Sequence, residues 1–228
     1  MSGVAKGVTN EKKQKHEKER AVKGCVVCNG DIRDYERARP QVSDYDLVIA
    51  ADGGFKHLKA MRLSPHAVIG DMDSVDADSL QDGGPEQISY PEKKDKSDAE
   101  LAVELAFTRG CDFVALLGAS GARLDHTLGN VSLLAKYPGR LAMVEGGTTL
   151  VAVDPSKKCK LHGKPGATVS LVPFPLAEKV TTQGLEYILE KEDLPPGTRG
   201  ISNKLAQENG CVCTGSGLLL VYIDNDAT

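Results

Sequence analysis

Apolar runs of strand length alternate with helix-like segments over the first 138 residues of the chain. Strands are expected at residues 23–28, 46–51, 87–90 and 111–117. A further strand is expected to end at Asp71. The run 46–51 is apolar on both faces, which is typical of a parallel strand covered by helices on both sides. Strands that alternate with helices indicate βαβ units. We therefore expect an α/β domain with a largely parallel, Rossmann-like sheet.

Helices are expected at residues 55–62, from residue 97 onward and at 124–136. Ser97 with Glu100 forms a capping box, so the second helix should begin there. This places Asp98 in the first helical turn, where the helix dipole favours a negative charge. The last helix carries its apolar side chains on one face: Leu128, Val131, Leu134 and Ala135.

The pattern changes after Pro138-Gly139. Residues 141–145 and 148–154 flank Gly146-Gly147, which predicts a β-hairpin. Short runs punctuated by Gly and Pro follow at 158–161, 167–173, 179–182, 187–189, 210–213 and 218–223. They predict an antiparallel, all-β sandwich. We thus expect three parts: a charged tail over 1–22, either helical or disordered, an α/β domain over 23–138 and a β-sandwich over 139–228.

Composition narrows the class of protein. A formal net charge of −4 over 228 residues argues against a nucleic-acid partner, which requires a basic face. No apolar run approaches the ~20 residues that span a bilayer, and the N-terminus lacks the apolar core of a secretory signal. We expect a cytoplasmic protein with no membrane partner, in which most of the six cysteines are reduced and buried. Cys25 and Cys28 should face opposite sides of one strand, which argues against a zinc site.

Acidic side chains follow a strand or start a helix at four places: Asp52, Asp71 with Asp73, Asp95 with Asp98, and Asp125. The carboxyl ends of parallel strands meet at one edge of the sheet, where open α/β sheets bind ligands. Gathered carboxylates repel each other unless a cation neutralises them. Mg²⁺ is the natural hard cation, because carboxylates and substrate phosphates bind it together. Taken singly, each loop is also compatible with a solvated acidic turn.

Basic and small residues beside these loops indicate a phosphate ligand. Lys94, Lys96 and Arg123 offer positive charge. The small residues of Gly118-Ala119-Ser120-Gly121 allow backbone N–H groups to approach a phosphate before a helix. The chain contains neither G-x-x-x-x-G-K-[ST] nor a G-x-G-x-x-G after a strand. These residues therefore indicate metal-assisted phosphoryl transfer without a P-loop.

In order and spacing, these segments resemble the thiamine pyrophosphokinase family. The similar segments are 52–54 (DGG), 69–74 (IGDMDS), 95–98 (DKSD), 118–126 (GASGARLDH), 183–187 (QGLEY), 201–203 (ISN) and 217–220 (GLLL). The resemblance covers roughly residues 23–224. It implies a Mg²⁺-dependent homodimer whose N-terminal domain binds ATP and whose C-terminal sandwich helps to bind thiamine. The implied reaction moves the β,γ-pyrophosphoryl group of ATP to the hydroxyethyl oxygen of thiamine and releases AMP.

The resemblance also implies roles for individual residues. The implied metal ligands are Asp71, Asp73 and Asp98, which with Arg123 form the expected catalytic set. The implied ATP contacts are Asp52, Gly53, Lys94, Asp95, Lys96, Ser97, Arg123 and Asp125. The implied thiamine contacts are Tyr187, Ser202 and Asn203. Either Asp71 or Asp98 could take the proton of the attacking hydroxyl, and the sequence does not choose between them.

Two departures from the family pattern stand out. The family often has two glycines before the arginine, and here the second is Ala122. The family often has a Trp on the thiamine side, whereas this chain has none and Tyr187 takes the corresponding place. A tyrosine ring can lie against the cationic thiazolium, although an aromatic residue in a β-sandwich more often belongs to the core.

Two alternatives to a thiamine-specific enzyme remain. A related diphosphokinase that acts on another hydroxyalkyl heterocycle, such as a pterin, would keep the acidic ATP site and change the C-terminal half. A thiamine- or nucleotide-binding protein without catalysis would not need Asp71, Asp73, Asp98 and Arg123 together. The segments around Gly184-Leu185 and Ser202-Asn203 favour thiamine.

Overall fold

The computed structural model describes residues 20–70, 84–91, 93–121 and 123–226. Six neighbouring strands run parallel, in the order β4-β3-β2-β1-β5-β6. Their bounds are β1 Lys23–Val27, β2 Leu47–Ala51, β3 Ala67–Gly70, β4 Glu86–Ser89, β5 Phe113–Leu117 and β6 Leu141–Glu145. Each expected strand of the first half is present, with ends shifted by one or two residues where the structure describes them.

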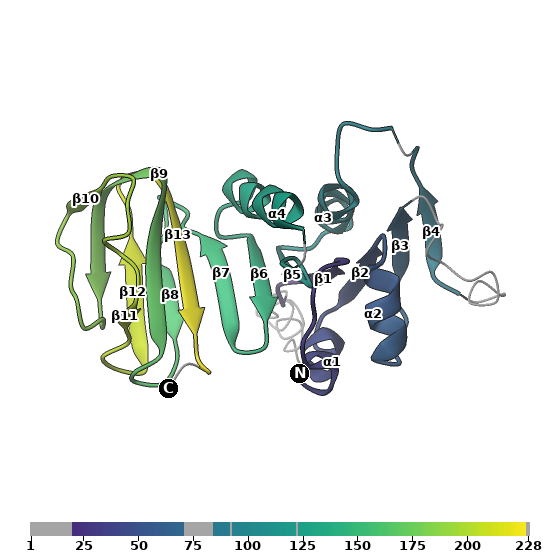
Figure 1. Ribbon diagram of the computed structural model, residues 1–228, viewed down its shortest axis with the longest axis horizontal. Helices are drawn as coiled ribbons and strands as arrows, with labels where there is room; N and C mark the ends of the chain where they lie inside the picture. The colour runs from purple at the N-terminus through teal and green to yellow at the C-terminus, as the bar shows by residue number, and fades with distance from the viewer. Residues whose placement is uncertain (1–19, 71–83, 92, 122, 227–228) are drawn as a thin grey trace, which may run out of the picture.

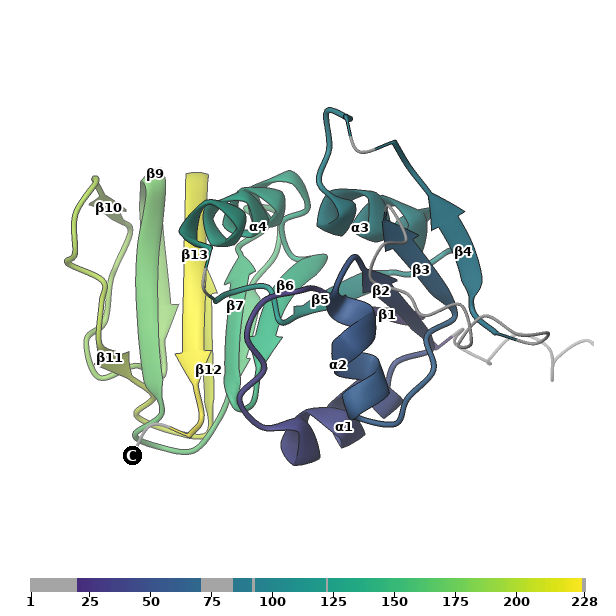
Figure 2. The ribbon, with the colours of Figure 1, turned by 45° about the vertical axis from the view of Figure 1, so that its right-hand side comes forward.

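Helices cover both faces of the parallel strands (Figures 1 and 2). They are α1 (Tyr35–Ser43) and α2 (Gly54–Ala60) on one face, and α3 (Asp98–Thr108) and α4 (Leu124–Lys136) on the other. Residues 25–28, in β1 and directly after it, show the reason, because their side chains alternate between the two cores. Cys25 and Val27 pack with α1 and α2, whereas Val26 and Cys28 pack with α3 and α4. The expectation that Cys25 and Cys28 face opposite sides is confirmed.

The second half of the sheet is antiparallel. After Gly146-Gly147, β6 returns as β7 (Thr148–Ala152), and the order continues β7-β13-β9-β12-β8. The remaining strands are β8 Cys159–His162, β9 Thr168–Gln183, β10 Glu192–Leu194, β11 Asn203–Lys204, β12 Asn209–Cys213 and β13 Ser216–Asp224. Strands β10 and β11 both pair with β9. The fold is therefore a mixed sheet, parallel first and antiparallel later, as the pattern predicted.

Strand β13 connects the cores of the two halves. Leu220 packs in the core beneath α3 and α4, whereas Leu219 and Val221 pack in a core formed by the antiparallel strands. Strand β6 pairs in parallel with β5 and antiparallel with β7. The hydrogen-bonded ladder thus continues across the boundary that we placed at residue 139, and the division into domains there stays a prediction.

Three local features differ from the expectation. Helix α1 was not predicted, because Pro40 interrupts its pattern and only two of its side chains, Ala38 and Val42, are buried. The runs 167–173 and 179–182 form the single strand β9. The run 187–189 lies outside any strand. Of the helices that the structure describes, none has the length and apolar character needed to cross a membrane.

Candidate functional site

A cleft of about 610 Å³ lies at the carboxyl ends of the parallel strands. The neighbouring strands β1 and β5 are followed by helices on opposite faces of the sheet, α1 after β1 and α4 after β5. Open α/β sheets bind ligands at such a switch in topology, where the two connections diverge. The cleft is lined by residues that follow β1, β2 and β5 and by the starts of α3 and α4. Its position therefore follows from the strand order.

The structure brings most of the predicted ATP contacts to this cleft. Its lining includes Asp52, Lys94, Asp95, Lys96, Ser97, Arg123 and Asp125, together with the expected metal ligand Asp98. Gly53 is absent from the lining; a Cβ there would lie 2.2 Å from Oδ1 of Asn29, so this glycine leaves room for the Asn29 side chain. Asp71 and Asp73 lie outside the described residues. Gly70, the last described residue before them, packs against the backbone of Asp52.

The start of α3 presents a lysine and a carboxylate to the cleft. Ser97 caps this helix by accepting a hydrogen bond from the backbone N–H of Glu100 at 3.2 Å, as the capping box predicted. Lys94 Nζ lies 2.7 Å from Asp98 Oδ1, and the two side chains are only 17% and 25% exposed. Both charges are thus partly withdrawn from water, which strengthens their interaction with a ligand.

Lys96 also lines the cleft, but its ammonium is engaged elsewhere. It donates to both carboxylate oxygens of Glu104, at 2.7 and 2.9 Å. Lys136 of α4 donates to the same carboxylate at 2.9 Å. Hydrogen bonds from Lys96 and then Lys136 lower the pKa of Glu104, and the Glu104 carboxylate raises the pKa of Lys96. Lys96 therefore belongs to an ion-pair network that joins α3 to α4.

Arg123 and Asp125 form an exposed pair at the start of α4. The guanidinium donates to the carboxylate at 2.6 Å and 3.2 Å, from Nη2 and Nε. The hydrogen bond to Arg123 lowers the pKa of Asp125, and the same contact raises the pKa of Arg123. Because the side chains are 69% and 66% exposed, solvent weakens this attraction. Arg123 is thus available to an anion that enters the cleft.

Sequence reasoning missed two parts of the cleft, the loop 29–31 after β1 and Asn130 of α4. Asn29 Nδ2 donates to Oδ2 of Asp52 at 3.3 Å, and Asp52 has a positive φ of 50°. Asn130 is 8% exposed and donates to the carbonyl of Ala119 at 2.8 Å. An amide inside the helix that covers the sheet, and an Asn-Gly-Asp directly after a strand, were the available signals.

The predicted thiamine contacts lie in the antiparallel half and are not part of this lining. Tyr187 is 69% exposed, so the alternative that it is a core aromatic is wrong. Asn203 is buried and uses its amide on the backbone of Tyr187, accepting from N–H at 3.0 Å and donating to the carbonyl at 2.7 Å. Ser202 has a positive φ of 63° and donates its N–H to Ser170 Oγ. Asn203 therefore holds the loop that presents Tyr187.

The expected metal ligands are only partly described. Among the residues that the structure places, no three His, Cys, Asp or Glu side chains are grouped so that they could hold a metal ion. Of the expected set only Asp98 is described, and it lies at the cleft. Cys28 also lines the cleft, but burial raises its pKa to about 12, so its thiol stays protonated at neutral pH.

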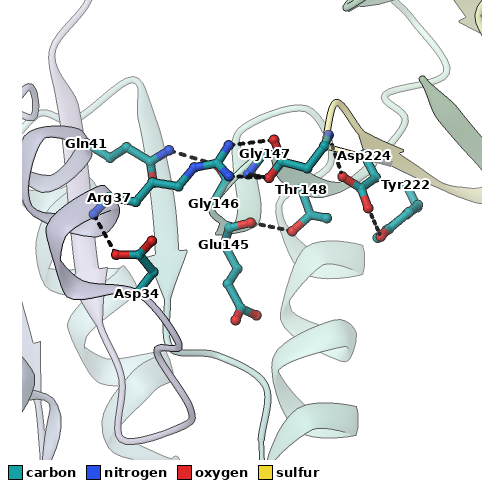
Figure 3. Close-up of polar contacts among 10 residues, drawn as sticks. Asp34, Arg37, Gln41, Glu145, Gly146, Gly147, Thr148, Tyr222 and Asp224 are labelled. Atoms are coloured by element: carbon teal, nitrogen blue, oxygen red, sulfur yellow. Dashed lines mark hydrogen bonds and ion pairs between the residues drawn. The ribbon is translucent and has the colours of Figure 1, made fainter. Parts of the chain in front are cut away.

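Polar contacts tie α1 to the turn between β6 and β7 (Figure 3). Arg37 forms a two-pronged ion pair with Asp226, which also accepts from the N–H of Gly147 at 3.0 Å. Gln41 donates to the carbonyl of Gly146 at 2.8 Å. The hydrogen bond from Arg37 lowers the pKa of Asp226. These contacts hold α1, and with it the loop after β1, against the second half of the sheet.

Two models of one family match this chain. The thiamin pyrophosphokinase catalytic domain matches residues 39–144, and the thiamin pyrophosphokinase vitamin B1 binding domain matches residues 153–219. A thiamine pyrophosphokinase of Bacillus subtilis is 25% identical over 193 residues, covering 80% of this chain and 89% of the relative. Thiamine pyrophosphokinase 1 of Arabidopsis thaliana is 26% identical over 174 residues, covering 69% of this chain and 65% of the relative.

A solved structure agrees with these matches. The crystal structure of thiamin pyrophosphokinase from Geobacillus thermodenitrificans has a TM-score of 0.77 and 28% identity, over 91% of this chain and 99% of that one. The two family models together span well over half of the residues, in the order of the parallel and antiparallel halves. The chain therefore belongs to the thiamin pyrophosphokinase family.

Proposed function

We propose that this protein is a Mg²⁺-dependent enzyme that transfers pyrophosphate from ATP to thiamine, giving thiamine diphosphate and AMP. Its family assigns the transfer reaction. The observation that carries the proposal is the cleft at the topological switch, where acidic and basic side chains from separate loops gather within the match to the catalytic domain. Phosphoryl transfer depends mostly on positioning and on neutralising charge, and such a cleft supplies both.

We place ATP in this cleft, with its phosphates near Lys94, Arg123 and residues 118–121. Lys94 is supported by its low exposure beside Asp98, and Arg123 by its exposed guanidinium at the first turn of α4. The other predicted ATP contacts that line the cleft are Asp52, Asp95, Lys96, Ser97 and Asp125. Lys96 contributes less than Lys94 in this proposal, since both Glu104 oxygens hold its ammonium and its side chain is 44% exposed, against 17% for Lys94.

Asp71, Asp73 and Asp98 are the proposed ligands of Mg²⁺. Asp98 fits this role because its carboxylate lines the cleft and is partly buried there, so that it can offer an oxygen ligand. Bound Mg²⁺ supplies neutralisation of the negative charge on the transferred phosphates. The side chains of this chain hold the nucleotide in line with the acceptor hydroxyl, and Asp71 or Asp98 takes the hydroxyl proton.

We assign thiamine to the antiparallel half, which we describe as a β-sandwich. Tyr187 offers an exposed ring for the thiazolium, Asn203 positions that ring by holding its backbone, and Ser202 lies next to Asn203. These residues do not line the ATP cleft of their own chain, which supports a homodimer in which the thiamine side of one subunit approaches the cleft of its partner. Ile188 and Ile201, which are 58% and 47% exposed on the same half, support such an interface.

The reaction is tested by incubating the full chain with ATP, Mg²⁺ and thiamine and measuring AMP and thiamine diphosphate. Formation of both supports the proposal. AMP formed with a pterin but not with thiamine would favour the related diphosphokinase. Absence of AMP with either acceptor would favour a binding protein without catalysis. Size-exclusion chromatography with light scattering tests the dimer, and fractionation of the source cells tests the proposed cytoplasmic location.

Substitution of Asp71 by asparagine tests the metal site. We expect Asp71→Asn to stay folded and to lose at least ~100-fold in turnover, as on removal of one electrostatic contributor to the transition state. Asp46→Asn is the control, because Asp46 precedes β2 at the opposite edge of the sheet and binds the N–H of Lys23. Wild-type turnover in Asp71→Asn would remove Asp71 from the metal site.

A further inference from the structure

The loop after β1 and the loop after β5 are joined by backbone hydrogen bonds. Gly30 N–H donates to the carbonyl of Gly118 at 2.8 Å, and Asp31 N–H donates to the carbonyl of Ser120 at 2.7 Å. Both loops line the cleft. The loop after β5 is the segment on which the phosphates are proposed to lie, so its position depends on the loop after β1.

The two loops approach too closely for any side chain at residue 30. A Cβ on Gly30 would lie 2.1 Å from the oxygen of Ser120 and 2.4 Å from that of Gly118. Protein interiors packed at this density transmit displacement rather than absorb it. A shift of Gly30 therefore moves the loop after β5 by a similar amount.

The remaining polar group of Gly30, its carbonyl, is held by His57 of α2. His57 Nε2 lies 2.8 Å from this oxygen, and Tyr35 Oη lies 2.7 Å from Nδ1 of the same ring. A carbonyl only accepts, so Nε2 carries a proton and donates to Gly30, while Nδ1 and the Tyr35 hydroxyl share the second hydrogen bond. The tyrosine thereby orients the ring that anchors Gly30.

The packing of α2 on β1 explains how His57 reaches this loop. A Cβ on Gly54, the first residue of α2, would lie 1.9 Å from the carbonyl oxygen of Val27, the last residue of β1. The helix therefore begins in direct contact with the strand that leads into Gly30. One turn later His57 faces the carbonyl of Gly30, with Leu58 buried beside it.

We propose that His57 is a positioning residue for nucleotide binding, which through Gly30 holds residues 118–121 where they bind the phosphates of ATP. The inference rests on the proposed ATP site. It requires no contact between His57 and the substrate, and His57 does not line the cleft within the described chain. This positioning role accounts for both hydrogen bonds of the His57 ring, to the carbonyl of Gly30 and to the hydroxyl of Tyr35.

The test compares His57→Leu with His57→Gln in the full chain. Leucine removes the donor to Gly30, whereas the side-chain amide of glutamine can place an N–H near the position of Nε2. We expect His57→Leu to weaken MgATP binding about tenfold, the size of one lost hydrogen bond to the part-buried carbonyl of Gly30. We expect His57→Gln to restore most of that affinity. Titration calorimetry with ATP and Mg²⁺ but no thiamine measures both.

His66→Leu is the matched control. Nδ1 of His66 accepts from the backbone N–H of Val48 at 2.9 Å, before β3 and away from the cleft. We expect it to lower the melting temperature without changing MgATP affinity. Hydrogen exchange supplies a readout that needs no nucleotide: the N–H groups of Gly30 and Asp31 should exchange faster in His57→Leu than in His66→Leu.

The outcomes separate this inference from the proposed function. Equal MgATP affinity in wild type and folded His57→Leu, or equal loss in both leucine variants, would overturn the role of His57. Unchanged exchange at residues 30–31 would overturn it as well. If wild type binds no MgATP while exchange at residues 30–31 still responds, the proposed function fails and the His57 anchor stands. If His57→Leu does not fold, Tyr35→Phe should show a smaller shift in the same direction, and wild-type behaviour there would contradict the inference.

Discussion

Replacement of Gly30 by alanine tests the contact between the two cleft loops. The added Cβ would lie 2.1 Å from the Ser120 oxygen, about 1.3 Å closer than the 3.4 Å at which ordinary contact begins. The atoms that it meets belong to the backbone of the loop after β5, so no side chain can rotate away. The two loops must separate, or Gly30 must move toward α2 and disturb the hydrogen bond from His57.

The expected magnitude follows from the size of this overlap. Forcing one extra methyl into a closely packed site destabilises a protein by about 1–3 kcal/mol. The separation also weakens the hydrogen bonds from Gly30 and Asp31 to the carbonyls of Gly118 and Ser120, each contributing about 0.5–1.5 kcal/mol. A displacement of about 1 Å in a positioned site can lower the rate about 100-fold. We therefore expect Gly30→Ala to lose about 1–3 kcal/mol in stability. We also expect it to lose about 100-fold in kcat/KM for ATP.

Gly129 provides the matched control for the same substitution. It lies in α4, lines the same cleft and has no atom within 4 Å of an added Cβ. Gly129→Ala should stabilise the protein by about 0.5–1 kcal/mol, because alanine favours a helix over the unfolded chain. Urea unfolding and steady-state kinetics measure both variants. Wild-type stability and kcat/KM in Gly30→Ala would show that the loops are not locked together and would refute the reasoning.

Two further predictions concern the charges around α3. We expect Lys94→Ala to weaken MgATP binding about tenfold or more, as for a lost charged hydrogen bond. Lys96→Ala should weaken binding less and lower the melting temperature. Calorimetry measures the binding and thermal unfolding the stability, and a larger loss of MgATP affinity in Lys96→Ala than in Lys94→Ala would show that Lys96 is the phosphate contact. Because Lys96 and Lys136 lower the pKa of Glu104 from 4.5, this carboxylate stabilises the fold above pH 4.5 and loses that contribution as the pH falls through its folded pKa. Glu104→Gln should flatten the acid limb of a stability–pH curve from urea unfolding, and an unchanged limb would contradict the network.

The local sequence pattern determined most of the secondary structure and its chemistry. The run 46–51, apolar on both faces, predicted a strand covered on both sides, and the structure places Ile49 and Ala50 of β2 in different cores. The Ser97 cap and the Gly146-Gly147 hairpin were also predicted, because caps and tight turns depend on residues a few positions apart. The acidic and basic loops were recognised because their residue types alone indicate metal and phosphate binding.

Only the tertiary structure decided which loops meet. The pairing of β1 with β5 brings Gly30 against Gly118 and Ser120, and the packing of α2 on β1 brings His57 to Gly30. Likewise, the backbone of the exposed Tyr187 is held by the amide of Asn203, which lies elsewhere in the chain. Periodicity and turn chemistry are properties of neighbouring residues, whereas strand order and helix docking result from how the whole chain buries its apolar surface. For this reason the residues that bear charge could be named from the sequence, and the residues that position them could not.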